Sequence, residues 1–180
     1  MQSGDLESRL IAAGVELLAE AGTDALTLRE IARRAGVSHG APRRYFPTHQ
    51  ALLAAIAREG YRKLGRLVDE TIGDSDADRR EALLALGRRY VDFARDEPGM
   101  FALMFRHDLL RGNNIGLRDE STPLFGVLTQ LIDPPAQAAA LWAALHGIAQ
   151  LWTWGTLQVV TGLASPEPLL IAAVDAHLEG

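Results

Sequence analysis

Apolar residues recur every three or four positions along most of this chain, and that spacing constrains the fold more than any other feature. Residues at i, i+3, i+4 and i+7 lie on one face of an α-helix, whereas a half-buried strand needs strict alternation of apolar and polar residues. No window of the sequence alternates in this way with β-branched enrichment. The sequence therefore predicts an all-α fold.

Three helices are expected in the first 50 residues. The first spans about residues 6–21 and stops at a glycine, a preferred residue at helix C-termini. The second spans residues 27–36 and opens on a capping box, Thr27-Leu28-Arg29-Glu30. The third, about two turns over residues 38–46, begins with a serine that can cap it. It must end before the proline that follows, because proline disfavours helical geometry in its predecessor.

The remainder of the chain is expected to form a second helical domain. Thr48 caps a long fourth helix, to about Ile72, that should bridge the two parts. Further helices are expected over residues 82–95, from residue 98, over 135–162 as the longest of all, and over 166–178, with a loop at 112–123 and an acidic linker at 74–78. The predicted domains are residues 1–50 and 51–180.

Charge is divided unevenly between these parts. Residues 1–66 contain ten Lys/Arg and seven Asp/Glu (+3), while residues 67–180 contain eight and sixteen (−8). The net charge of −5 therefore hides a basic N-terminal part, and DNA contact needs only a local basic face.

Composition also limits the location of the protein. The chain has no cysteine, which excludes disulfide scaffolds and thiolate metal sites. Its first twenty residues carry four carboxylates and no basic start before an apolar run, so we expect no signal peptide and a cytoplasmic location. The most apolar stretch, residues 136–160, is interrupted by polar side chains, so we expect no membrane partner.

Residues 35–38, Ala-Gly-Val-Ser, join the second and third helices as in a helix-turn-helix, whose second helix lies in the major groove of DNA. This spacing alone is a weak signal, because two helices packed for stability alone would also show it. However, His39, Arg43 and Arg44 are long donors on a segment with little apolar surface. Such a helix needs a partner other than a protein core.

Several strings then carry a specific resemblance: Leu26-Thr27-Leu28-Arg29-Glu30-Ile31-Ala32, Ala35-Gly36-Val37-Ser38, Tyr45-Phe46-Pro47 and Leu52-Leu53. Together they resemble the N-terminal domain of the TetR family of repressors, over residues 6 to about 60. The string Leu141-Trp142-Ala143-Ala144-Leu145-His146-Gly147 resembles the Trp-His-Gly (WHG) segment of one TetR subgroup's C-terminal domain. The resemblance implies a homodimeric repressor that binds a near-palindromic DNA operator and leaves it when a small-molecule effector binds.

The resemblance also implies which residues face DNA. Base edges are expected to meet Arg29, His39, Gly40 and Arg43. Phosphates are expected to meet Thr27, Arg44, Tyr45 and His49. Ser38 is expected to contact DNA as well. The family usually has tyrosine in place of Arg43 and lysine in place of His49. Contact of Arg43 with a phosphate instead of a base is therefore an open alternative, and a neutral His49 would contribute less to affinity, in a pH-dependent way.

A small-molecule pocket is expected in the C-terminal part, where the family senses ligands. Aromatic side chains with a few polar groups describe such a pocket, but they equally describe an ordinary core with one hydrogen-bonded histidine. The predicted ligand-binding residues are Phe93, Met100, Phe101, Met104, Phe105, Trp142, His146, Gln150 and Thr153.

Family members pair their last two helices with those of a partner, so a dimer interface is expected on apolar stripes of the last helices. Steps of three and four along a helix also describe a seam packed inside one protomer, and this core interpretation carries the greater weight. The predicted interface residues are Leu145, Ile148, Trp152, Gly155, Val159, Leu170, Val174 and His177.

Other candidate sites are rejected on their chemistry. Three aspartates in residues 74–78 mimic a calcium loop, but its sixth and twelfth positions are Arg79 and Ala85 instead of glycine and glutamate. Arg106-His107-Asp108 has no identifiable nucleophile beside it. We expect no metal, no cofactor and no enzyme activity. Two alternatives remain: a small helical ligand-binding protein or enzyme with a vestigial DNA-binding head, and a purely dimeric scaffold.

Overall fold

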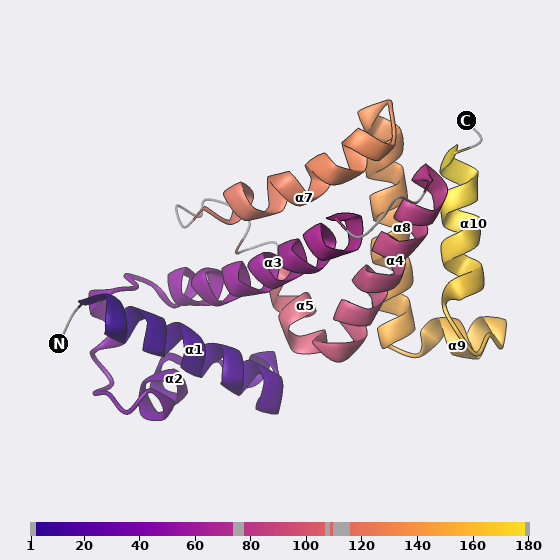
Figure 1. Cartoon of the computed structure of the whole chain (residues 1–180). Coiled ribbons are helices and arrows are strands. Elements are labelled where there is room, and N and C mark those ends of the chain that lie inside the picture. The colour runs from indigo at the N-terminus through magenta and orange to yellow at the C-terminus, as the bar shows by residue number, and fades with distance from the viewer. Residues whose placement is uncertain (1–2, 74–77, 107–108, 110–115, 179–180) are drawn as a thin grey trace. The chain divides into compact units, whose positions relative to one another are not determined.

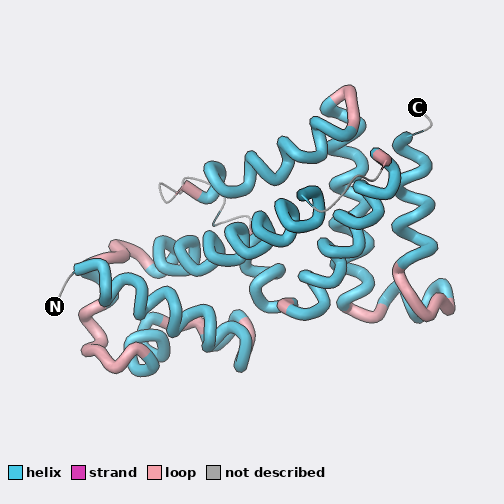
Figure 2. Tube along the Cα trace, viewed as in Figure 1, coloured by secondary structure: helices cyan, strands magenta, loops and turns pink. Residues whose placement is uncertain are grey.

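The computed structural model describes residues 3–73, 78–106, 109 and 116–178, and every regular element in these ranges is a helix or a 3-10 turn (Figures 1 and 2). The predicted all-α fold is confirmed. The elements are α1 Ser3–Ala21, η1 Thr23–Ala25, α2 Leu28–Arg34, η2 Pro42–Arg44, α3 His49–Gly73, α4 Arg79–Asp96, α5 Pro98–Met104, α7 Leu117–Leu131, α8 Pro135–Thr153, α9 Thr156–Thr161 and α10 Glu167–Leu178. None of the described helices is long and apolar enough to cross a membrane.

The chain divides into two compact units. The first comprises residues 1–62 and 99–119, and the second comprises residues 63–98 and 120–180. The chain therefore passes from one unit to the other inside α3, and α5 belongs with the N-terminal helices although it comes late in the sequence.

In the first unit, local capping starts α2 and α3 where the sequence predicts them. The Thr27 hydroxyl accepts the backbone N–H of Glu30 at 3.2 Å and so starts α2. The reciprocal half of the capping box does not form, because the Thr27 N–H donates to the Ala25 carbonyl and the Glu30 carboxylate accepts from Arg33. The Thr48 hydroxyl likewise accepts the N–H of Ala51 at 3.0 Å, which confirms the predicted cap of α3.

The predicted third helix, residues 38–46, is wrong. The segment contains only the 3-10 turn η2, which begins at Pro42. Proline has no N–H and cannot donate the i→i−4 bond to the Ser38 carbonyl, which accepts the N–H of Ala41 at 3.0 Å instead. We refer to residues 38–46 as the reading segment.

Fully buried side chains of three helices form the core of the first unit. They are Leu10 of α1, Ile31 of α2, and Leu52 and Ile56 of α3, all 0% exposed. These residues lie on the apolar stripes that the helical period predicts.

In the second unit, α4, α8 and α10 pack against one another (Figure 1). Leu83, Leu141 and Leu170, one from each helix, are all 0% exposed. Ion pairs join α4 to α10 at the edge of this core: Arg88 contacts Glu167 at 2.5 Å. These contacts make the three helices the stable centre of the unit.

Two further predictions about the C-terminal part need correction. Of the predicted loop at 112–123, residues 112–115 lie outside the described residues, and α7 already begins at Leu117 and continues through Pro123. The predicted helix over 135–162 ends at Thr153, because Gly155 adopts a left-handed φ of 77° that breaks the helix before α9. The longest helix is α3, with 25 residues.

Candidate nucleic-acid interface

The turn after α2 is fixed by its backbone and by one arginine of α1. Gly36 has a φ of 68°, a left-handed conformation that favours glycine, and the N–H of Val37 returns to the Ala32 carbonyl at 3.0 Å. Arg9 donates from Nη2 to the carbonyl of Ala35 at 2.6 Å. Arg9 thus supplies positive charge where the α2 dipole ends and holds the turn that leads into the reading segment.

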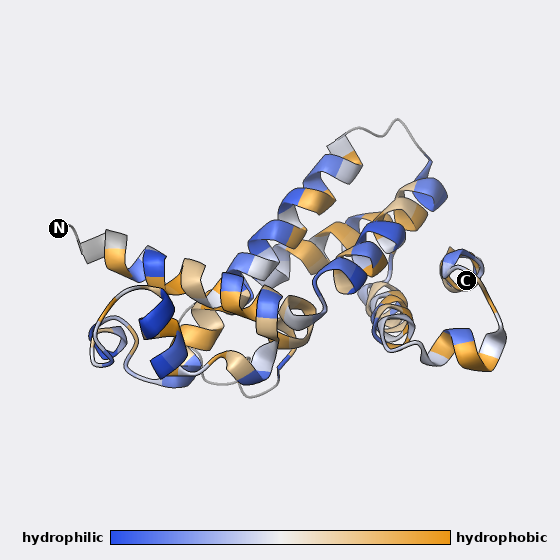
Figure 3. Ribbon diagram, turned by 90° about the horizontal axis from the view of Figure 1, so that it is seen from below, coloured by the Kyte–Doolittle hydropathy of each residue, from blue (hydrophilic) through white to orange (hydrophobic). Residues whose placement is uncertain are grey.

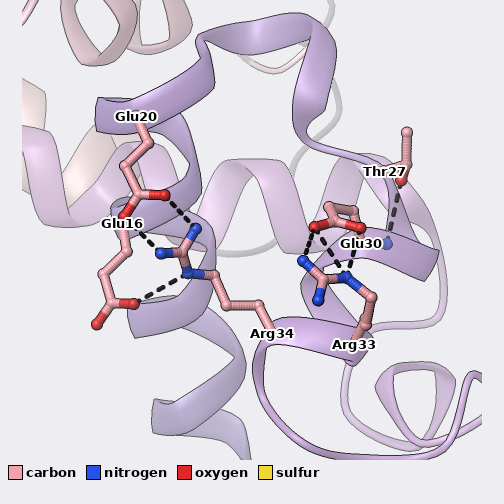
Figure 4. A network of polar contacts seen from close by, with 6 residues as sticks. All are labelled: Glu16, Glu20, Thr27, Glu30, Arg33 and Arg34. Carbon is pink, nitrogen blue, oxygen red and sulfur yellow. Dashed lines mark hydrogen bonds and ion pairs between the residues drawn. The ribbon is translucent and has the colours of Figure 1, made fainter.

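A second arginine fastens α2 to α1 (Figure 4). The Arg34 guanidinium donates to the Glu20 carboxylate at 2.5 and 2.6 Å and to Glu16 at 3.2 Å. Glu16 and Glu20 are one helical turn apart, so one planar guanidinium reaches both. The hydrogen bond from Arg34 lowers the pKa of Glu20. On the same helix, Arg33 is paired with Glu30 at 2.5 Å.

The remaining basic side chains of this region face solvent. Arg29, His39, Arg43 and Arg44 are all exposed. In the described part of the chain, no side-chain hydrogen bond or ion pair engages Arg43 or Arg44. The arginines of the first unit therefore divide into those used inside the protein, such as Arg34, and those left available at the reading segment.

The other residues predicted to face DNA have different surroundings. Ser38 and Gly40 are exposed, and a Cβ at Gly40 would meet no atom within 4 Å. Thr27 is exposed while its oxygen caps α2. Tyr45 is half-buried. His49 is also half-buried, and its Nε2 donates to the Leu26 carbonyl at 2.5 Å.

The predicted ligand-binding residues are divided between the two units. In the second unit, the Tyr90 hydroxyl is hydrogen-bonded to His146 Nδ1 at 2.9 Å, and the Trp142 ring lies 5.9 Å from the His146 ring. Burial lowers the pKa of His146, which favours its neutral form. Phe93 is buried, whereas Trp142 is 40% exposed. Gln150 and Thr153 are half-buried.

In the first unit, the predicted ligand-binding residues of α5 lie mainly in the core. Met100, Phe101 and Met104 are 5%, 1% and 0% exposed. Phe105 packs edge-on against Tyr61, with ring centroids 6.0 Å apart. The sequence did not single out Tyr61, whose hydroxyl donates to the Met104 carbonyl at 2.8 Å.

The residues predicted for the dimer interface also fall into different classes. Four of them are 9% exposed or less within the second unit: Leu145, Trp152, Leu170 and Val174. Their side chains fill the core of the protomer, which is the alternative that the sequence left open. Ile148 is half-buried, and His177 donates to the Ala173 carbonyl at 2.7 Å. Gly155 lies at the break after α8, and Val159 is 85% exposed.

No candidate metal site appears in the described residues, since nowhere in them do three His, Cys, Asp or Glu side chains gather. Of the string Arg106-His107-Asp108, the last two residues lie outside the described residues. Asp78, the last of the three aspartates in the calcium-loop mimic, caps α4 by accepting the N–H of Glu81 at 2.9 Å. Residues 74–77 lie outside the described residues.

Two family models match this chain. The model described as "Bacterial regulatory proteins, tetR family" matches residues 10–56, which hold the turn and the reading segment. The model described as "Tetracyclin repressor-like, C-terminal domain" matches residues 83–177, more than half of the chain. The chain belongs to the TetR family. The family that the sequence predicts is thereby confirmed.

HTH-type transcriptional regulators are among its relatives. The chain is 29% identical over 101 residues to HTH-type transcriptional regulators of Mycobacterium bovis and Mycobacterium tuberculosis. The match covers 56% of this chain and 43% of the relatives, so the chain matches less than half of their length.

Solved structures share the fold over nearly the whole chain. A protein of unknown function from Rhodococcus sp. RHA1 is 28% identical, with a TM-score of 0.80 over 97% of this chain and 94% of that one. The TetR regulator SCO0520 from Streptomyces coelicolor is 30% identical, with a TM-score of 0.55 over 94% and 97%. The multidrug binding protein EbrR complexed with ethidium is 21% identical, with a TM-score of 0.69 over 96% and 98%, and supports the fold alone.

Sequence reasoning missed two residues that build this site, Arg9 and Arg34. Both act through contacts with residues far along the chain, the Ala35 carbonyl and the Glu16 and Glu20 carboxylates. The spacing of the two glutamates on one face of α1 was a signal for an arginine partner, but nothing local identified which arginine would reach them.

Proposed function

We propose that this TetR-family chain is a ligand-responsive, DNA-binding transcriptional regulator that acts as a repressor. The observation that carries the proposal is the availability of Arg43 and Arg44. Both are exposed and make no side-chain hydrogen bond or ion pair within the described ranges, whereas Arg33 and Arg34 are neutralised by carboxylates. Available guanidinium groups on an exposed turn suit phosphate oxygens and guanine edges.

In this proposal, residues 1–50 form the DNA-binding domain and residues 51–180 the ligand-binding and dimerisation domain. The exposed side chains of Arg29, His39 and Arg43 meet base edges, and Gly40 allows close approach to the groove. Thr27, Arg44 and Tyr45 contact phosphates, and Ser38 is a further contact to DNA. His49 has the weakest support as a phosphate contact, because its ring is hydrogen-bonded to the Leu26 carbonyl.

A homodimer supplies two reading segments for the two halves of a near-palindromic operator. The support lies in the composition of α8 and α10. From Pro134 to Pro166 the chain has no Asp, Glu, Lys or Arg, and the outward side of α10 carries small residues such as Ala172 and Ala176. Helix α8 lies wholly within this uncharged range, and a helix without a charged face is usually covered on more than one side.

The proposed effector is a small molecule that binds in the C-terminal domain, which we assign to the WHG subgroup. Trp142, His146 and Gly147 are the residues of that motif. A neutral His146 hydrogen-bonded to Tyr90 offers aromatic surface and a polar group without net charge. The neighbour EbrR is a multidrug binding protein complexed with ethidium or imidazole, which is consistent with a sensing role for the fold.

Repression ends when the effector favours a form that cannot bind the operator. Helix α3 belongs partly to each unit, so in this proposal it transmits the effect of the effector to the DNA-binding residues. A coupling free energy of about 1–3 kcal/mol would lower operator affinity about 5- to 150-fold. We propose that this regulator works in the cytoplasm, without a cofactor and without enzyme activity.

The test is selection of bound fragments from sheared genomic DNA, followed by titration of the enriched operator. We expect a near-palindrome to be enriched. Arg43→Ala should weaken operator binding about 5- to 150-fold if Arg43 contacts a base, with little change for unrelated DNA. If it contacts a phosphate, binding to all sequences should weaken and the salt slope should fall by about 1.

Arg33→Ala is the matched control, because it removes the same charge from a side chain already paired with Glu30. Its effect should be clearly smaller. A failure to enrich any palindrome at low salt would instead favour a ligand-binding protein with a vestigial head. Equal DNA binding by Arg43→Ala and the wild type would favour a dimeric scaffold.

A further inference from the structure

Between α8 and α10 the chain does not take the shortest path but forms the short helix α9, Thr156–Thr161 (Figures 1 and 3). Gly155 and Gly162 lie at its two ends with φ of 77° and 69°. Both glycines adopt the left-handed conformation, which ends a helix sharply. We call residues 154–162 the α9 arm.

Hydrogen bonds hold the arm in one conformation. The Gln158 side chain donates from Nε2 to the Trp152 carbonyl at 2.9 Å, which ties α9 back to the end of α8. The Gly162 N–H donates to the Gln158 carbonyl at 2.9 Å and closes the last turn. An arm that is ordered in this way loses little conformational entropy when it contacts a partner.

The arm displays apolar side chains to solvent. Trp154, Val159 and Val160 are 67%, 85% and 70% exposed, the three largest values among the exposed large apolar residues of the described chain. Figure 3 shows hydrophobic residues on this segment beside α8. Scattered single exposures are ordinary, but three strongly exposed apolar side chains within seven consecutive residues are not scattered.

The absence of charge on this surface limits what can cover it. No charged residue occurs between Pro134 and Pro166, a range that includes the whole of α8 and the arm. Charged residues usually set the choice between different partners and the rate of encounter. A surface without them fits another apolar surface of the same composition, as in a two-fold contact between identical chains.

Area also favours a second copy. A tryptophan side chain buries about 150–250 Å² in a contact, so Trp154 offers on the order of 100 Å². A stable interface needs about 800 Å² on each partner, so the arm is too small to bind a separate protein by itself. It adjoins α8, whose exposed Ala140 and Ala143 permit close approach but offer little side-chain area. The arm would supply large side chains that these alanines lack.

We propose that the α9 arm packs on a second copy of this chain and anchors the dimer through Trp154, Val159 and Val160. The inference rests on the homodimer of the proposed function and adds to it a named anchor outside α8 and α10. In this dimer, small side chains let the helices of the two copies approach closely, and the arm stabilises the contact between the copies.

The dimer dissociation constant of the full chain, measured by sedimentation, tests the proposal. We expect Val159→Glu/Val160→Glu to raise it about tenfold or more, because two charges would be buried in an apolar contact. Thr122→Glu/Gln130→Glu is the matched control, with the same added charge at exposed positions of α7 in the same unit, and should leave it unchanged. Circular dichroism should be the same for all three proteins, since every substituted residue is exposed.

A thiol probe gives a second measurement. The chain has no cysteine, so Val159→Cys introduces a single reactive site. Maleimide labelling should be slow at concentrations where the chain is dimeric and fast after dilution. The wild type could be dimeric while the glutamate variant has the same dissociation constant and labelling does not depend on concentration. That result would overturn the role of the arm and leave the dimer intact. A monomeric wild type would overturn the dimer itself.

Discussion

Gly14 of α1 lies against the core of the first unit at a distance that leaves no room for a methyl group. A Cβ built on Gly14 would be 2.3 Å from Cδ1 and 2.8 Å from Cγ1 of Ile56, which is 0% exposed. Real Cβ contacts are essentially never shorter than 3.0 Å. Gly14→Ala therefore forces Ile56 or the helix axis to move inside a close-packed interior.

Two opposing terms set the size of the effect. Alanine is favoured over glycine in a helix by about 0.8–1 kcal/mol. Overpacking a core costs about 1–3 kcal/mol. Gly14→Ala should therefore destabilise the first unit by about 0–2 kcal/mol. Gly126→Ala in α7 is the matched control, because its Cβ would meet no atom within 4 Å, and it should stabilise the second unit by about 1 kcal/mol.

Amide hydrogen exchange reads the stability of each unit separately, and urea unfolding of the whole chain supplements it. Ile56→Val removes Cδ1, the atom closest to the added methyl group, and should cost about 0.5–1.5 kcal/mol alone. The double variant should lose less stability than the sum of the losses in the two single variants, because the atom in the shortest clash is absent. Strict additivity, or a Gly14→Ala protein stabilised like Gly126→Ala, would refute the steric argument.

Two further predictions concern titrating groups. The hydrogen bond from Arg88 lowers the pKa of Glu167 below its ordinary 4.5, so this ion pair stabilises the second unit above about pH 4.5 and its contribution is lost as the pH falls further. In a plot of the unfolding midpoint against pH, Glu167→Gln should therefore flatten the decline at acid pH. An unchanged decline would contradict this prediction. Burial raises the pKa of Tyr61 to about 12, so the folded state should lose stability as the pH rises from 10 towards 12. Tyr61→Phe should remove that loss and, at neutral pH, cost about 1 kcal/mol because the Met104 carbonyl loses its donor; equal alkaline sensitivity of the two proteins would refute the assignment.

The first 50 residues illustrate how far local signals determine structure. Thr27 and Thr48 cap α2 and α3 as the sequence predicts, because an N-cap bond spans only three residues. The reading segment was predicted as a helix since its length and flanking residues fit one. Pro42 removes a hydrogen-bond donor in its interior, and the segment forms turns instead. The predicted donors to DNA depend on residue type and could be named without the correct backbone conformation.

By itself, the sequence determined the all-α class, the TetR family and the capped starts of α2 and α3, since each depends on residue spacing or on contacts within one turn. Tertiary structure decided which arginines are available for DNA: Arg34 and Arg43 look alike in the sequence, but only Arg34 lies within reach of carboxylates on α1. It also assigned Leu145 and Leu170 to the protomer's own core and left Val159 exposed. An apolar stripe predicts that a residue will be covered. Only the packing of helices distant in the sequence decides which side chains cover it.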